Sequence, residues 1–311
     1  MKIMLLYGKE NLRTYLKVRK RVEYMKLMIK FVFSVLGIVL ISGFPVLIGG
    51  LVAGELRLAE YVSALDAVLR GLWPLQEFTV LNMRTNREIP LFPTISDYIT
   101  YSLELLFLAF AVAIFFAITF TVLTMLLKEK ARHRIKMALY FLESLPDLLV
   151  IMLAQLAVLA IYLQTNVLIS KIAVVQGEHI YWLPVLCLAL LPMIQLYRLC
   201  MLTFQDEERK MYVELAHSLG FSKVFVIWVH MFRNAIISVF FQSKKTIWFM
   251  LSNLFVLELM FNIPGIMLFM KDNISPQVFL VSIFSFFLPI FMLYSIGEWL
   301  LLRHLRGKEA I

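Results

Sequence analysis

The chain has 311 residues, of which 61% are hydrophobic and 16% are charged, and its formal net charge is +9. Soluble globular domains are roughly half apolar and about a quarter charged, so this composition excludes an ordinary water-soluble enzyme or binding module. The positive charge lies mainly between long apolar blocks, without an aromatic-rich basic groove, which argues against nucleic-acid binding. We therefore expect an integral membrane protein.

Six apolar blocks follow one another along the chain. Most approach the length of about 20 residues that a helix needs to cross the hydrocarbon core of a bilayer. Pro45, Pro192 and Pro289 lie inside blocks, where neighbouring helices and water can satisfy the freed carbonyl groups. The pattern predicts an all-α membrane protein with six transmembrane helices. The expected spans are residues 31–52, 105–127, 148–163, 181–197, 235–257 and 278–296.

Lys and Arg residues are distributed unevenly over the two sides of these spans. They are abundant in residues 1–30, in every second connection and in residues 303–311, whereas the alternate connections hold few. Since such an excess marks the cytoplasmic side, both termini are predicted to be cytoplasmic. The chain would then consist of a basic cytoplasmic leader (1–30), a six-span domain (31–302) and a cytoplasmic tail (303–311).

The connection after the first span, residues 54–99, is unusually long and would lie outside the cytoplasm. Loops of this length without a role are uncommon in compact proteins. Trp73, Pro74, Pro90 and Pro93, set among apolar residues, favour order over disorder. We expect a cap of short helices suited to docking a partner protein.

The cytoplasmic connection at residues 203–234 has the pattern of two short helices joined at a glycine. Helix-forming residues run to Gly220, which can end a helix by adopting the left-handed conformation. Ser222 then occupies the position of an N-cap, so a second short helix is expected over residues 223–232. Such a unit is rigid enough to transmit force if a pocket of another protein holds it.

The connection contains Tyr212, Val213, Ala216 and Gly220, followed by His230, Arg233, Asn234 and Ala235. With these residues it resembles the EAA loop of ABC importer permeases, in which a Glu-Ala-Ala pattern and a following glycine dock into a cleft of the ATPase. It is most similar to the first permease subunit of the oligopeptide/dipeptide/nickel branch. Glu214 departs from that branch, which usually has Arg or Lys at this position. The resemblance implies an ATPase-coupling role for Tyr212, Glu214, Ala216, Gly220, Ser222, His230, Arg233 and Asn234.

A second stretch, with Glu258, Phe261, Asn262, Pro264 and Gly265, resembles the Glu-x-x-Phe-Asn-x-Pro-Gly ending of the fifth span in the same branch. The branch's Pro-Gly-Asp-Pro signature after the first span is absent, and Gly49-Gly50 and Gly54-Glu55 stand there instead. That departure leaves the coupling role intact but bears on the substrate. The residues of the motif named as a site are Glu258, Asn262, Pro264 and Gly265.

The resemblance implies a type I ABC importer permease fold in a bacterial cytoplasmic membrane, with peptides as the transported solute. A second homologous permease chain would complete the translocation pathway, and two ATPase subunits would bind below, one of them at residues 211–229. An extracytoplasmic substrate-binding lipoprotein would dock on the cap. The chain itself is expected to catalyse nothing and to hold no cofactor or metal, because ATP and Mg would bind to the ATPases.

Two other functions stay open from the sequence. Nickel or metallophore uptake would use the same architecture. A self-sufficient secondary transporter is a different class, and it would need charged sites near the middle of the membrane. The only candidates for such sites are Lys244 and Lys245, about ten residues into the fifth span. We expect at least one of them to face the translocation pathway, the alternative being that both reach back to the inner interface.

Overall fold

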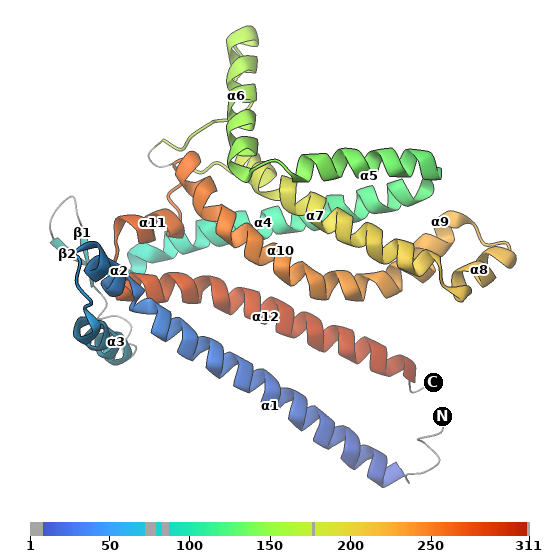
Figure 1. Ribbon diagram of the computed structural model, residues 1–311, viewed down its shortest axis with the longest axis horizontal. Coiled ribbons are helices and arrows are strands. Elements are labelled where there is room, and N and C mark those ends of the chain that lie inside the picture. The colour runs from blue at the N-terminus through green and yellow to red at the C-terminus, as the bar shows by residue number, and fades with distance from the viewer. Residues whose placement is uncertain (1–8, 72–78, 83–86, 176–177, 310–311) are drawn as a thin grey trace. The chain divides into compact units, whose positions relative to one another are not determined.

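The computed structural model describes residues 9–71, 79–82, 87–175 and 178–309 (Figure 1). The chain divides into two compact units, Met1–Phe92 with Asn273–Leu288, and Pro93–Asp272 with Pro289–Ile311. Among the described residues, six helices are long and apolar enough to cross a membrane, which confirms the predicted all-α fold with six spans. They are Met25–Val52, Leu91–Leu126, Asp147–Thr165, Trp182–Glu208, Lys223–Met260 and Pro276–Leu301.

The first unit begins with α1 (Lys9–Ser42) and α2 (Phe44–Val52), which together contain the first candidate span. Helix α1 passes residue 30 without a break, so the expected leader and the first span share one helix. The helices meet at Gly43, where a Cβ atom would lie 2.5 Å from the Tyr61 ring of α3 (Leu58–Gly71). The first unit also includes the start of α12 (Pro276–Glu309), whose Phe287 ring stacks on Phe31 of α1 at 5.9 Å.

The predicted cap is only partly helical. Residues 58–71 form the expected kind of short helix, α3, but β1 (Thr79–Asn82) and β2 (Arg87–Pro90) form an antiparallel pair. The expectation of helices throughout the cap was therefore wrong for this stretch. Thr79, Val80 and Ile89 are β-branched and favour strands, and Pro90 ends the second strand at a position where a missing N–H is tolerated.

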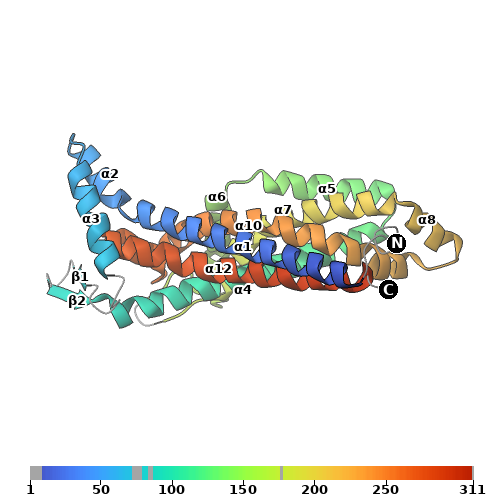
Figure 2. The same ribbon diagram turned by 90° about the horizontal axis from the view of Figure 1, so that it is seen from below.

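The second unit is a bundle organised around α7 (Trp182–Glu208), along which α10 (Phe232–Met260) packs (Figures 1 and 2). Helix α7 buries Leu188, Ile194, Tyr197 and Met201. The remaining helices of this unit are α4 (Leu91–Leu126), α5 (Glu129–Glu143), α6 (Asp147–Thr165), α8 (Met211–Ser218), α9 (Lys223–Phe225), η2 (Val226–Met231) and α11 (Ile266–Asp272), with the end of α12.

The second short helix of the predicted loop is not a separate element. Helix α9 passes through the π-helical turn η2 directly into α10, so one helical rod runs from Lys223 to Met260. No glycine or proline interrupts these residues, which explains why the helix does not stop at Phe232 as expected. The second helix of the loop is consequently continuous with the fifth span.

Candidate functional site

The turn after α8 is closed by backbone hydrogen bonds. The Gly220 N–H donates to the carbonyl of His217 at 3.0 Å, and the Phe221 N–H donates to that of Ala216 at 3.2 Å. This pair of bonds is the Schellman arrangement, which needs a left-handed residue after the helix. Gly220 provides it with φ +85°, as the sequence predicted.

The next helix starts two residues later on Ser222. The Ser222 Oγ accepts a hydrogen bond from the Phe225 N–H at 3.4 Å, which confirms the predicted N-cap. The Ser222 carbonyl accepts from the Val226 N–H at 3.0 Å and so begins the helical ladder. A C-terminal cap at Gly220 therefore ends α8, an N-terminal cap at Ser222 begins α9, and only a few residues link the two helices.

Polar contacts at Tyr212 fix α8 against the ends of α7 and α10. The Tyr212 hydroxyl donates to Glu207 of α7 and accepts from Asn234 Nδ2 of α10 at 3.2 Å. Lys210 Nζ donates to the other oxygen of Glu207 at 2.5 Å. Burial, followed by the bond to Glu207, raises the pKa of Tyr212 to about 12, so the hydroxyl keeps its proton near neutral pH. Val213 and Ala216 complete the attachment by burying their side chains.

The opposite side of α8 presents apolar side chains to the exterior. Met211, Leu215 and Leu219 are exposed at a spacing of four residues, which places them along one face of the helix. Past the turn, Phe221, Val224 and Trp228 are also exposed. Apolar patches of this kind on a protein surface mark interaction sites. Five of the predicted coupling residues are also exposed in this segment, namely Glu214, Gly220, Ser222, Arg233 and Asn234.

His230 supports the turn from within. Its ring lies 5.8 Å from the Phe225 ring and 6.3 Å from the Phe221 ring, and the two phenylalanines stack at 5.0 Å. Nearly all the predicted loop residues thus belong to one structure, but with separate roles. Tyr212 and Asn234 anchor α8, Gly220 and Ser222 shape the turn, His230 packs beneath it, and Glu214 and Arg233 lie on its surface.

Two anchors of the loop were not singled out from the sequence. Glu207 holds Tyr212, and Glu208 binds Arg132 of α5, with Arg132 Nη1 and Glu208 Oε2 2.8 Å apart. Arg132 also donates to the carbonyl of Met125 at 3.0 Å. The acidic and basic run at residues 206–210 was the available signal, because so dense a cluster of opposite charges invites ion pairing.

The ending of α10 is built around a buried carboxylate, Glu258, whose side chain has no exposed surface. Its Oε1 accepts a hydrogen bond from Ser102 Oγ of α4 at 2.6 Å, and its Oε2 accepts one from the Leu268 N–H of α11 at 2.9 Å. Ser102 Oγ in turn accepts from the Ile266 N–H at 2.8 Å. The carboxyl group is buried, but both of its oxygens have a hydrogen-bond partner, so it ties α4, α10 and α11 together.

The other residues of this motif shape the chain around that carboxylate. A Cβ atom on Gly265 would lie within 2.5 Å of the carboxyl carbon and both oxygens of Glu258, so only glycine fits. Asn262 has the left-handed φ of +51° and donates through Nδ2 to the carbonyl of Val174 at 3.2 Å. Pro264 lies in the link to α11, and Gln155 of α6 donates to the carbonyl of Met260 at 3.1 Å. The residues of the predicted motif therefore pack together as one cluster around Glu258, which we call the Glu258 knot in the sense of close packing rather than of a threaded chain.

The sequence model of one protein family, the binding-protein-dependent transport system inner membrane component, matches residues 109–298. This match covers more than half of the chain, including α8 and the Glu258 knot. The chain belongs to this family. It is therefore a permease component of an ABC importer with the type I permease fold, and the family works with ATPase and substrate-binding components. No curated protein matched the chain in a separate sequence comparison.

Two lysines of this permease lie far along α10, with Lys244 roughly 18 Å from the start of the helix at 1.5 Å per residue. Lys244 is half-buried, and its Nζ lies 5.2 Å from the centre of the Tyr294 ring and 5.6 Å from that of Phe241. In the described part of the chain, no carboxylate lies within ion-pair distance of Lys244. Lys245 is exposed. The two lysines therefore differ in their surroundings, because Lys244 lies over the rings of Phe241 and Tyr294 whereas Lys245 is exposed.

Proposed function

We propose that this permease is one of two homologous membrane subunits of a bacterial peptide importer, and that it couples to an ATPase through α8 and the turn at Gly220. The observation that carries the proposal is the exposed apolar face of α8 on a helix whose other side is anchored to α7 and α10. A helix fixed on one side and exposed on the other suits docking into a pocket of a moving partner.

The continuous rod from Lys223 to Met260 supports a mechanical role for this contact. Movement of an ATPase bound at α8 would reach α10 through the hydrogen bond between Tyr212 and Asn234 and through the closed turn at Gly220. At the far end of the rod, the Glu258 knot joins α10 to α4 and α11, so these helices would move with it. We infer rigid-body rotation of helices as the means of alternating access, with both termini and the α8 turn on the cytoplasmic side.

Peptide as the solute is supported by the motifs at residues 212–235 and 258–265 and by Lys244. An ammonium group held over aromatic rings, without an acidic partner among the described residues, suits the carboxylate of a passing peptide. A second permease chain would line the rest of the pathway, an extracytoplasmic binding protein would deliver the peptide, and ATP with Mg would stay on the two ATPases.

The partners are tested by purifying the tagged chain from its source membrane in mild detergent and identifying the co-purifying proteins by mass spectrometry. We expect two ATPase subunits and a second permease. Leu215→Asp places a charge on the apolar face without touching the core and should release the ATPases while the second permease stays bound. Lys130→Asp, an exposed position on α5, is the control and should retain both. A chain that purifies alone and still moves solute would overturn the proposal.

The solute is tested separately by uptake into proteoliposomes that hold the purified complex and its binding protein. Radiolabelled short peptides and nickel chelates are supplied in parallel, with ATP inside the vesicles. Uptake of peptide with no uptake of nickel supports the proposal, and the reverse result assigns the complex to metal uptake.

A further inference from the structure

Helix α3 follows the first candidate span after five residues and has three distinct faces. The inner face packs on the junction of α1 and α2. There the Tyr61 hydroxyl donates to the carbonyl of Leu40 at 2.8 Å, the Tyr61 ring covers Gly43, and Val68 is fully buried. This attachment fixes the rotation of α3 about its own axis, so the remaining two faces have defined directions.

The second face is apolar but exposed. Leu58, Val62 and Leu69 are 59%, 64% and 54% exposed, and their spacing aligns them in one stripe along the helix. The third face is polar and carries Glu60, Ser63, Asp66 and Arg70. The amphipathic pattern is therefore wider than the packing on α1 and α2 requires, and one strip of large apolar side chains is left for another contact.

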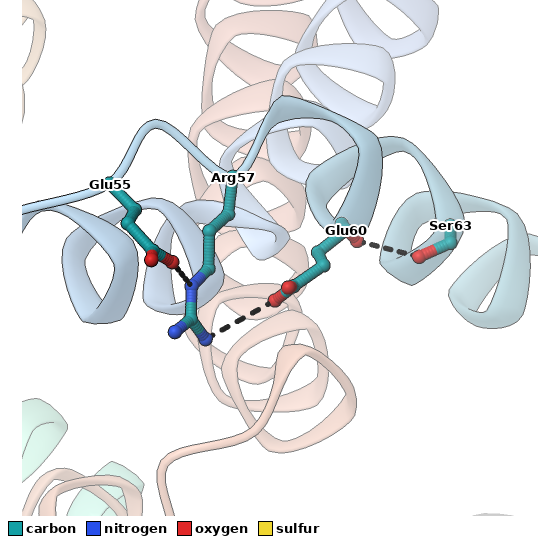
Figure 3. Close-up of polar contacts among 4 residues, drawn as sticks. All are labelled: Glu55, Arg57, Glu60 and Ser63. Carbon is teal, nitrogen blue, oxygen red and sulfur yellow. Dashed lines mark hydrogen bonds and ion pairs between the residues drawn. The ribbon is translucent and has the colours of Figure 1, made fainter. Parts of the chain in front are cut away.

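Polar contacts at the start of α3 keep the charged side chains on the polar face (Figure 3). Arg57 bridges two carboxylates, with its Nε 3.3 Å from Glu55 and its Nη1 3.4 Å from Glu60. Near the other end, Arg70 pairs with Asp66 at 2.8 Å. Exposed pairs of this kind add little stability, but they align the charges away from the apolar stripe.

The direction of α3 indicates what covers the apolar stripe of Leu58, Val62 and Leu69. Figure 2 shows α3 running across the direction of α1, near the end of that helix. Since α1 and α2 contain a candidate membrane span, a helix lying across the end of that span runs close to the membrane plane. Helix α2, which packs against α3, also exposes Phe44, Ile48 and Leu51. Both helices of this pair therefore expose large apolar side chains next to the end of the span.

We propose that α3 lies in the interface between the bilayer and water where the first span ends, with Leu58, Val62 and Leu69 inserted among the lipids. Glu60, Ser63, Asp66 and Arg70 face the water. An amphipathic helix with one apolar and one charged face is bound in this way by apolar burial at the headgroup boundary. The partner of the stripe is thus the lipid surface, and a soluble binding protein would meet the polar face of α3.

The test compares two neighbouring exposed positions, Val62→Cys and Ser63→Cys, in the purified complex. Each variant is labelled with a fluorophore and placed in phosphatidylcholine nanodiscs that contain nitroxide-labelled lipid. The natural Cys187 and Cys200 are buried, so an unmodified complex gives the background labelling. We expect lipid nitroxide to quench the label at residue 62 several-fold more than at residue 63, and aqueous iodide to show the reverse order. Leu69→Cys and Asp66→Cys should repeat the contrast.

Equal access of iodide to residues 62 and 63 would overturn the proposal. Protection of residue 62 that appears only after the substrate-binding protein is added would also overturn it, and would make the stripe a protein-docking surface. The measurement does not require transport, so its outcome is independent of whether the ATPase coupling proposed above is correct.

Discussion

The close packing of Gly265 in the Glu258 knot allows the loss of stability in Gly265→Ala to be predicted. In Gly265→Ala the new methyl group would occupy the position of the Glu258 carboxyl group, which lies within 2.5 Å. That carboxyl group is the end of a flexible side chain, but it is buried and bonded to Ser102 and the Leu268 N–H, so it cannot move without breaking those bonds. The substitution should therefore push the Glu258 carboxyl group away from at least one of these hydrogen-bond partners.

The loss of stability can be worked out from two effects, the overpacking of the core and the loss of a hydrogen bond of Glu258. Overpacking a filled core costs about 1–3 kcal/mol, and leaving a buried polar group without its hydrogen bond costs about 1–3 kcal/mol. Gly265→Ala should destabilise the fold by about 4 kcal/mol if one bond is lost, which lowers the unfolding midpoint by about 8 °C at roughly 2 °C per kcal/mol. Intrinsic fluorescence on heating in detergent gives the midpoint. Gly37→Ala, where a Cβ would meet nothing within 4 Å, is the matched control and should unfold like the parent.

A double-mutant cycle separates this mechanism from a general intolerance of alanine. Glu258→Ala removes the carboxyl group that the new methyl group would strike. In that background, Gly265→Ala should cost far less than in the parent, so the two effects should be strongly non-additive. Equal midpoints for Gly265→Ala and the parent, or simple additivity in the cycle, would contradict a clash between the new methyl group and the Glu258 carboxyl group.

Three further predictions concern the loop and the pathway. Gly220→Val forces a β-branched residue into a left-handed conformation at about 1–2 kcal/mol and should reduce ATPase co-purification, whereas Gly220→Asn, which tolerates that conformation, should not. Equal co-purification of the two variants would contradict the role of the turn. Tyr212→Phe removes the hydroxyl that donates to Glu207, so it should destabilise the fold by about 2 kcal/mol. It should also raise the number of ATP molecules hydrolysed per solute molecule transported in vesicles. If that number is unchanged, the bond between Tyr212 and Glu207 has no part in coupling. Lys244→Met should lower peptide uptake several-fold without changing assembly, while Lys245→Met should change it little; equal uptake by both would remove Lys244 from the pathway.

The local features of the loop could be predicted because short-range rules govern them. A glycine after helix-forming residues and a serine two positions later indicate the turn at Gly220 and the cap at Ser222, and both are present. The length of α10 was underestimated, since the expectation of a second short helix placed a boundary where no glycine or proline enforces one. The strands at 79–82 and 87–90 were missed for a related reason, because short apolar stretches do not distinguish strand from helix.

The environment of Glu258 could not be predicted from spacing. The sequence placed it at the end of a span, where a charge at the membrane surface is ordinary, yet the side chain is fully buried. Its partner Ser102 is 156 positions earlier in the chain, and no local pattern connects the two. Tyr212 differs, because its partner Glu207 is only five positions away and the charged run at residues 206–210 was a local signal that the family motif did not include.

The most direct test of the account is ATP-driven uptake by the purified complex in proteoliposomes, compared between the parent chain and Leu215→Asp. We expect the parent complex to accumulate solute against its gradient only when ATP is present, and the variant to lose both accumulation and bound ATPase while its membrane subunits stay paired. Accumulation by the chain alone, without ATP or ATPase, would contradict the coupling role of α8 and would place transport in the membrane helices themselves.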